Sequence, residues 1–283
     1  MAALPGGDAC YAHWLSAAAR LEAQAQQHVF DCCPELTGLV DGKWTREALL
    51  FVHIGKTGGS SVAHWLRLAN VSAVQVHVHP LLPSVVQRFG SRVVISVRDP
   101  IERLLSAFNY EQARILSIWR KMDGCFASVN ELVERALLTA NATPACRSMA
   151  LSVAPNFSMP NTPLPAVAPF HGGHVSLGLC HYLAGVMPLL RQDRVWLVRQ
   201  ETLAADLGGL ARWLGRDNST ALPRIPKLTV TPRKDPPLSA AARQLLREVV
   251  LVPEYALMER LELLAANGKR IASARRIASA RSR

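Results

Sequence analysis

The sequence predicts an α/β protein built on an open parallel sheet that is flanked by helices. Two short runs, residues 49–54 and 93–98, are almost wholly apolar, which is typical of strands buried on both faces of a parallel sheet. Residues 74–78 alternate like a further strand. Helical patterns follow these runs, and strands that alternate with helices join through right-handed crossovers into such a sheet. A chain of 283 residues is long enough to bury its own core.

The predicted elements fill one domain, residues 46–267. A polar, Ala- and Gln-rich lead-in at residues 1–45 precedes it and carries no recognisable motif. Besides the three strands, the patterns predict a helix at 60–69, a helix at 99–119, a helix at 178–190, a strand at 195–199, a helix at 202–214 and C-terminal helices from 239 to 264.

Local residues indicate where two of these helices begin. Asp99 has the place of a helix N-cap, Pro100 the first helical position and Glu102 the first turn, an arrangement that satisfies the free amides of a helix start. Ser239 is expected to cap the C-terminal helices, which Pro253 breaks or restarts.

Two segments depart from the alternating pattern. Residues 141–170 hold six prolines, which predicts a long exposed loop or excursion. Residues 268–283 contain the sequence Arg-Ile-Ala-Ser-Ala-Arg twice and form a basic tail of low complexity.

The net charge of +11, from 32 Lys and Arg against 21 Asp and Glu, favours polyanionic partners: nucleic acid, acidic lipid, phosphorylated cofactors, or sulfated and carboxylated sugars. Six of the cations lie in residues 269–283, which hold no acid. The other 26 leave residues 1–268 with a charge of only +5. Nucleic acid is therefore not an expected partner.

Two counts bear on the compartment. The chain has six cysteines and four Asn-x-Ser/Thr triplets, at Asn70, Asn141, Asn156 and Asn218, which favours the lumen of the secretory pathway. Chance occurrence in a cytoplasmic protein is the alternative. Asp8 interrupts the place of a signal-peptide core, and no run of eighteen apolar residues occurs. Any membrane anchor is expected to lie outside this chain.

Residues 53–61, His-Ile-Gly-Lys-Thr-Gly-Gly-Ser-Ser, link the first strand to its helix. Glycines let backbone amides approach an anion, a helix start offers N–H groups, and Lys56 adds a mobile charge. The loop is thus P-loop-like. It is not the loop of nucleoside triphosphatases, which needs a glycine where this chain has Leu50, and the Gly-x-Gly-x-x-Gly pattern is absent too. A glycine-rich turn without a ligand is the alternative.

A second candidate anion site follows the strand at 93–98. Arg98 closes that strand at its carboxyl end, where ligands bind in open α/β sheets. Ser106 lies about two turns into the next helix, and the two side chains are expected to converge. The alternative for Arg98 is a surface ion pair with Glu102.

Together with residues 53–61, residues 97–106, Val-Arg-Asp-Pro-Ile-Glu-Arg-Leu-Leu-Ser, resemble the two donor-binding motifs of sulfotransferases that use 3′-phosphoadenosine 5′-phosphosulfate (PAPS). The chain looks most like the Golgi carbohydrate O-sulfotransferases of the heparan and uronyl branch, over roughly residues 48–265.

The resemblance implies roles for particular residues. The 3′-phosphate would bind Arg98 and Ser106, and a basic loop near the C-terminus would add Arg233 and Lys234. The 5′-phosphosulfate would be held by the first loop, that is by Lys56, Thr57, Gly58, Gly59, Ser60 and Ser61.

The resemblance also implies a histidine as general base, within a His-x-His segment between the two motifs. His79 is the first candidate, by its place in His77-Val78-His79, and His77 is the second. The runner-up pair is His171 and His174, which could instead contact acceptor or donor.

Luminal relatives form disulfides in the region of Cys125, Cys146 and Cys180. The sequence leaves their pairing open, and one of the three needs another partner.

The implied activity is transfer of a sulfuryl group from PAPS, the co-substrate, to a hydroxyl of a carbohydrate, by in-line displacement and without a metal. The alternatives are a non-catalytic polyanion-binding module on the same fold and a sulfotransferase with a non-glycan acceptor. The expected place is the Golgi lumen, with the cytoplasm as the alternative, and the oligomeric state stays open.

Overall fold

The computed structural model describes residues 39–40, 43–44, 48–77, 80–113, 124–139, 141–153, 173–175, 177–216 and 236–267. Its centre is a four-stranded sheet in the order β4-β3-β5-β6, and all three strand pairs are parallel. The predicted α/β class is therefore confirmed. The strands are β3 (Leu49–His53), β4 (Ala73–His77), β5 (Val93–Val97) and β6 (Val195–Arg199).

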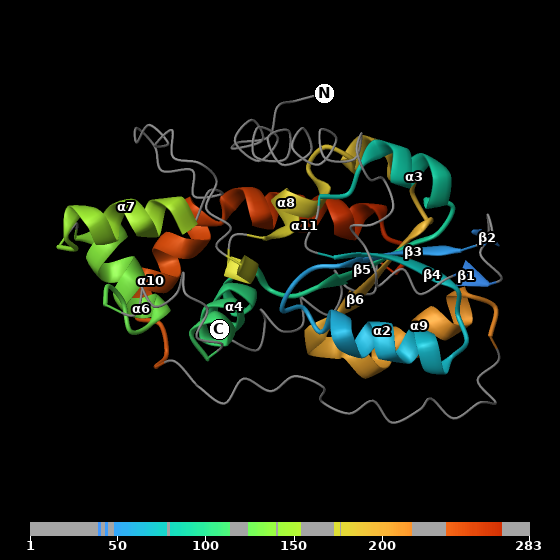
Figure 1. Cartoon of the computed structure of the whole chain (residues 1–283), viewed down its shortest axis with the longest axis horizontal. Coiled ribbons are helices and arrows are strands. Elements are labelled where there is room, and N and C mark those ends of the chain that lie inside the picture. Colours follow the sequence, from blue (N-terminus) through green and yellow to red (C-terminus); the bar gives the residue numbers. More distant parts are fainter. Residues whose placement is uncertain are drawn as a thin grey trace.

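Helices lie on both faces of this sheet and in a separate group beside it (Figure 1). They are α2 (Gly59–Leu68), α3 (Pro83–Phe89), α4 (Pro100–Ala113), α6 (Val129–Leu132), α7 (Pro144–Val153), α8 (Leu179–Leu183), α9 (Leu203–Trp213), α10 (Ala240–Leu245) and α11 (Val252–Leu264). Shorter or π-helical pieces are η1 (Val133–Leu138), η2 (Gly173–Val175), η3 (Met187–Leu189), η4 (Gln200–Thr202) and η5 (Leu246–Val250).

Both faces of the sheet are covered, which explains why β3, β5 and β6 are almost wholly apolar. Along β3, Leu50 and Val52 pack into one core with residues of α3, α8 and α11. Leu49 and Phe51 point into the opposite core, which α2 and α9 complete. Successive side chains of a strand alternate between faces, so a strand between two helical layers is expected to be apolar at nearly every position.

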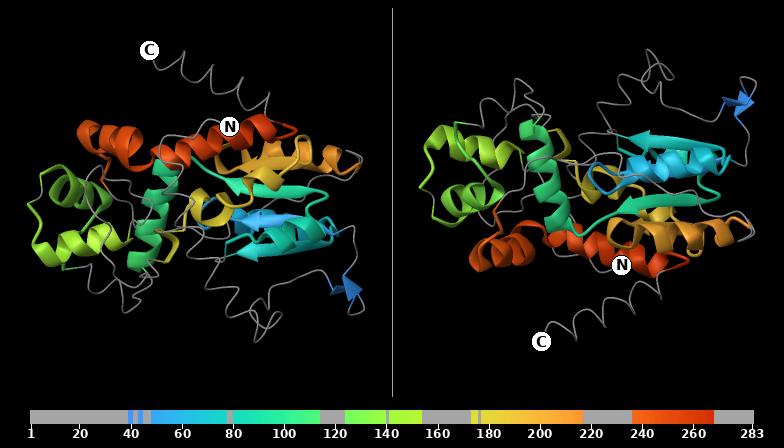
Figure 2. Two further views of the ribbon diagram at one scale, coloured as in Figure 1. Left: turned by 90° about the horizontal axis from the view of Figure 1, so that it is seen from above. Right: turned by 90° about the horizontal axis from the view of Figure 1, so that it is seen from below.

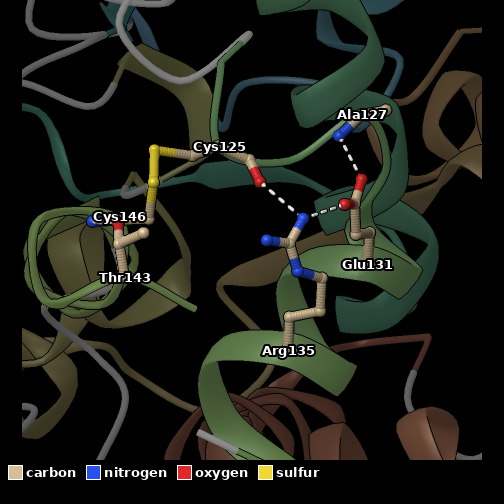
Figure 3. Close-up of a disulfide and its surroundings, with 6 residues drawn as sticks. All are labelled: Cys125, Ala127, Glu131, Arg135, Thr143 and Cys146. Atoms are coloured by element: carbon tan, nitrogen blue, oxygen red, sulfur yellow. Dashed lines mark hydrogen bonds and ion pairs between the residues drawn. A yellow bond between two sulfur atoms is a disulfide. The ribbon is translucent and has the colours of Figure 1, made fainter. Parts of the chain in front are cut away.

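A third core lies beyond the end of the sheet. It joins the apolar side of α4 to α6, η1, α7, α10 and η5, and Figure 2 shows α4 between this helical lobe and the sheet in both views. Cys125 and Cys146 are joined by a disulfide within the lobe (Figure 3). Arg135 donates to the Cys125 carbonyl at 3.3 Å and pairs with Glu131, whose pKa is lowered chiefly by the N–H of Ala127.

The lobe corrects one prediction. Residues 144–153 form α7, so the expected loop over residues 141–170 is wrong for this part. Pro144 stands at the first helical position, where its missing N–H costs nothing, and the Thr143 hydroxyl accepts from the N–H of Cys146 at 3.3 Å. Residues 154–170 lie outside the described ranges.

Other boundaries follow the predicted signals. The Asp99 carboxylate accepts from the N–H groups of Ile101 and Glu102 at 3.0 and 3.1 Å, and Ser239 accepts from the N–H of Ala242 at 3.1 Å. The expected helix at 178–190 is instead split into α8 and η3, with Pro188 at the start of η3. The short antiparallel pair β1 (Leu39–Val40) and β2 (Lys43–Trp44) was not predicted.

The outer edge of β6 is closed by the chain itself. Asn267 accepts from the N–H of Leu197 at 3.1 Å and donates to its carbonyl at 2.8 Å. The N–H of Ala266 donates to the Val195 carbonyl at 2.8 Å, and the Arg199 N–H donates to Asp206 at 3.0 Å. Among the helices assigned in these ranges, none has both the length and the apolar character needed to cross a membrane.

Candidate functional site

The strand order defines where a ligand-binding site is expected. The chain runs from β3 outward to β4 and then returns to β5 on the other side of β3. Loops that leave such neighbouring strands in opposite directions open a crevice at the carboxyl ends of the strands, and ligands of open α/β sheets bind there. The two predicted anion-binding segments follow β3 and β5 and therefore flank this point.

The loop after β3 has an unusual backbone that leads directly into α2. Lys56 and Gly58 have positive φ values of 67° and 82°, and Gly58 is the N-cap of α2. A Cβ atom on Gly59 would lie 1.9 Å from the His53 ring. Glycine is therefore required at position 59 because the helix start packs directly on His53.

Thr57 fixes this loop to the neighbouring strand. Its side chain is buried, with the hydroxyl 2.6 Å from the Ile54 carbonyl and 2.7 Å from the Ser96 hydroxyl. The predicted donor-binding role of Thr57 therefore rests on its backbone, because its side chain is occupied within the protein. Ser60 is exposed and Ser61 is half-buried in the first turn of α2.

Lys56 extends toward α4. Its Nζ atom lies 3.8 Å from the centroid of the Tyr110 ring, a distance at which an ammonium group is attracted to the face of an aromatic ring. The loop cation is thus placed beside an aromatic side chain.

Arg98 contacts the loop after β3 and does not form the surface ion pair with Glu102 that was the alternative. Its Nη1 atom donates to the Lys56 carbonyl at 3.4 Å, whereas Glu102 pairs with Arg243 at 3.4 Å. The Nε atom of Arg98 is buried and has no hydrogen-bond partner in the part of the chain that the structure describes. Ser106 is half-buried on α4. Arg98 and Ser106, both within the described ranges, form no hydrogen bond with each other, so the structure does not show the expected contact between them.

Two histidines end adjacent strands in register. His53 and His77 are paired positions of β3 and β4, and their rings stack with centroids 4.0 Å apart. The His77 Nδ1 atom is 2.7 Å from the His53 carbonyl oxygen. Because a carbonyl can only accept, Nδ1 carries a proton, so in the neutral tautomer Nε2 is the ring atom that can accept one.

His53 differs from His77 in the hydrogen bond that its Nδ1 atom makes. This atom lies 3.2 Å from the amide nitrogen of Gln75 and accepts from it. Burial, reinforced by His77, His174 and Lys56, lowers the pKa of His53 from 6.5 to about 3. His53 therefore stays neutral at physiological pH and serves the packing of the loop.

His174, one of the runner-up pair, is brought to the same place by η2. Its ring stacks on Tyr110 at 5.4 Å and meets His77 edge-on at 5.6 Å. The backbone N–H of His174 donates to the buried carboxylate of Glu111 at 2.9 Å. Lys56 and His77 are thus connected through two intervening rings.

Arg103 anchors the segment that carries His174. The buried guanidinium donates to the carbonyls of His174, Leu177 and Val175 at 2.7, 3.3 and 3.4 Å. Burial lowers the pKa of Arg103. The arginine holds η2 against α4, and with it the position of the His174 ring.

Arg103, Tyr110 and Glu111 were not predicted as site residues. A signal for the first two exists, because Arg103 precedes Ser106 by three positions and Tyr110 follows it by four, and such neighbours share one face of a helix. His79, His171, Arg233 and Lys234 lie outside the described ranges. Within those ranges no cluster of His, Cys, Asp and Glu has the form of a metal site.

Comparison of the chain with known protein families, with curated proteins and with solved structures finds no match.

Proposed function

We propose that this protein is a sulfotransferase that transfers the sulfuryl group of PAPS to a hydroxyl of a carbohydrate. The observation that carries the proposal is the approach of two anion-binding segments at the carboxyl ends of β3 and β5, where Arg98 donates to the backbone of Lys56. PAPS carries a 5′-phosphosulfate and a 3′-phosphate, so it needs two neighbouring anion sites. The resemblance of residues 53–61 and 97–106 to donor-binding motifs supports the same assignment.

The loop after β3 would take the 5′-phosphosulfate. Its backbone amides and the N-terminus of α2 attract an anion, and Lys56 adds a full charge. As the acceptor oxygen attacks sulfur, negative charge builds on the oxygen that bridges sulfur and phosphorus. A cation fixed beside that oxygen stabilises the transition state more than the ground state.

The second segment would take the 3′-phosphate. Arg98 has a buried Nε donor without an acceptor in the described part of the chain, and a phosphate oxygen would satisfy it. Ser106, Arg233 and Lys234 are the further ligands that the resemblance implies.

The acceptor hydroxyl must lose its proton during transfer, and a neutral histidine is suited to accept it. The resemblance favours His79, and His77, whose Nδ1 donates to the His53 carbonyl and leaves Nε2 outside that bond, is the second candidate. The disulfide between Cys125 and Cys146, together with the disulfide-bonded state of Cys180, supports a luminal compartment, for which we propose the Golgi.

Transfer of radiolabelled sulfate from PAPS to a panel of glycosaminoglycans, galactans and simple alcohols tests the proposal. We expect label on a carbohydrate, and we expect Lys56→Ala to lower kcat about 100- to 1000-fold, as for loss of one charge-stabilising donor. Lys43→Ala, which removes a lysine from β2, is the control and should keep full activity.

Two results would overturn the proposal. PAPS binding by calorimetry without transfer to any acceptor would indicate a polyanion-binding module. Transfer that requires ATP and Mg²⁺ in place of PAPS would indicate a kinase.

A further inference from the structure

The contact between Lys56 and Tyr110 is not explained by the donor-binding motifs. We propose that Tyr110 is a positioning residue: its ring holds the Lys56 ammonium group beside the loop before the donor arrives. The contact on which this rests is the 3.8 Å distance from Lys56 Nζ to the ring centroid. The inference deepens the proposed sulfotransferase function and depends on it for its catalytic meaning.

The backbone of Lys56 has an uncommon conformation. Its φ of +67° is costly for a residue with a side chain, and such conformations recur in loops that bind ligands. The lysine side chain has four rotatable bonds, and fixing its ammonium group in one place costs conformational entropy. Attraction to an aromatic face offsets part of that cost.

The ring is itself held in place. Tyr110 stacks on His174 with an interplanar angle of 11°, and His174 is fixed by the Arg103 guanidinium and the Glu111 carboxylate. The His174 ring also packs on the loop, since a Cβ atom on Gly55 would lie 3.0 Å from it. The loop and the stacked rings of Tyr110 and His174 therefore pack together around Lys56.

An aromatic partner suits this role better than an acid would. A carboxylate would pair with Lys56, neutralise its charge and repel the incoming phosphosulfate. The nearby Glu111 carboxylate is buried and accepts from the N–H of His174. A neutral ring orders the ammonium group without adding negative charge, and the contact can persist while the ammonium group binds the donor.

Kinetic comparison of Tyr110→Phe with Tyr110→Leu tests the catalytic consequence. Phenylalanine keeps the ring, so kcat should stay within about twofold of the wild type. Leucine removes the ring, and kcat should fall about 5- to 30-fold, the range that corresponds to loss of a cation–π interaction, while KM for PAPS changes less. Phe89→Leu is the matched control, because it removes a ring that lies beneath another cation, Arg88.

A second measurement does not depend on activity. The six lysines of the chain can be dimethylated with ¹³C-formaldehyde, which keeps their charge, and Lys56→Arg identifies the Lys56 signal. We expect an upfield ring-current shift of that signal in the wild type and in Tyr110→Phe, and its loss in Tyr110→Leu.

The outcomes separate the two proposals. If the wild type transfers no sulfate, the proposed function fails, and the methyl spectra alone decide whether Tyr110 orders Lys56. The positioning role is overturned if the Lys56 signal is unshifted in the wild type. It is equally overturned if Tyr110→Leu keeps full kcat, or if Tyr110→Phe is as impaired as Tyr110→Leu.

Discussion

His53 and His77 acquire different chemistry although they are neighbours in register. The His77 ring donates from Nδ1 to the backbone of β3, which leaves Nε2 as the ring nitrogen outside that bond. The His53 ring is buried against Gly59 and is kept neutral by its surroundings. A difference in burial and in one hydrogen bond therefore separates a candidate base from a packing residue.

The general base can be identified by paired substitutions. We expect His79→Ala to lower kcat about 100- to 10,000-fold, the contribution of a positioned proton acceptor, and His77→Ala to have a smaller effect. Sulfate transfer measured at saturating PAPS and acceptor gives both values. His64→Ala, on α2 and bonded to Arg67, is the control. A larger loss in His77→Ala than in His79→Ala would assign the base to His77 instead.

His53 should make the stability of the protein depend on pH. In the unfolded chain its pKa is 6.5, whereas in the folded protein it is about 3. Between these values the unfolded state binds one more proton, so its contribution to stability is complete above about pH 6.5 and declines as pH falls, by up to about 1.4 kcal/mol per pH unit. Urea unfolding between pH 4.5 and 7.5 measures this slope.

Replacement of the titrating group isolates its share of the slope. His53→Gln should flatten the pH dependence in this window, whereas His64→Gln should retain the slope of the wild type. Parallel loss of stability in the wild type and in His53→Gln would show that His53 is not its source.

The sequence located part of this site and missed the rest for a physical reason. Lys56 and Arg98 could be placed because each follows an apolar strand at its carboxyl end. Tyr110 shares a helix face with Ser106, but its contact with Lys56 and the role of Glu111 could not be predicted, because both depend on which face α4 turns toward η2, and that is set by packing of Ile101 and Phe108 in the lobe core. Short-range patterns carry no record of such packing.

At the scale of elements, the four strands of the parallel sheet were predicted within one residue, whereas α6, η1 and α7 of the lobe were not predicted. β3, β5 and β6 are almost continuous apolar runs. Such runs are easily recognised in the sequence, and they occur here because the helices on both faces of the sheet bury the side chains. Helix α7 was not predicted because the high number of prolines in residues 141–170 indicates a loop, whereas it is the position of each proline that decides whether a helix can form. A proline at the first turn is compatible with a helix, as Pro144 demonstrates.

The disulfide of the lobe should stabilise its helices locally. Cys125 and Cys146 are 21 residues apart, and closure of a loop of that size contributes about 3 kcal/mol by restricting the unfolded chain. We expect Cys125→Ser/Cys146→Ser to lower the free energy of unfolding, measured by urea denaturation, by about that amount. Amide exchange should accelerate most in α6 and α7, while β3 and β5, the internal control, change least. Equal acceleration in lobe and sheet would contradict a local role.

At the scale of the whole molecule, α4 connects two units. Its apolar face, with Ile101, Leu104 and Phe108, belongs to the lobe core, and its other face carries Arg103 and Tyr110 into the candidate site. By packing against the apolar face of α4, the helical lobe therefore helps to fix Arg103 and Tyr110 in their positions beside Lys56.

The compartment proposed for the molecule can be tested through its surface. Asn70 and Asn141 are exposed, and each begins an Asn-x-Ser/Thr triplet. When the chain is expressed through the secretory pathway, we expect a peptide-N-glycosidase to lower its apparent mass, and Asn70→Gln and Asn141→Gln to remove one glycan each. Asn161→Gln, which lies in no such triplet, is the control. An unchanged mass after the enzyme treatment would contradict a luminal location.

The closed edge of β6 has a consequence for how this protein meets other chains. An exposed edge strand is a template on which a foreign or identical strand can be added, and aggregation often starts there. Along β6 the Val195 carbonyl, both backbone groups of Leu197 and the Arg199 N–H are already bonded, to Ala266, Asn267 and Asp206. One asparagine side chain thus imitates the peptide group of a fifth strand, so β-strand addition by a second copy is blocked at this edge.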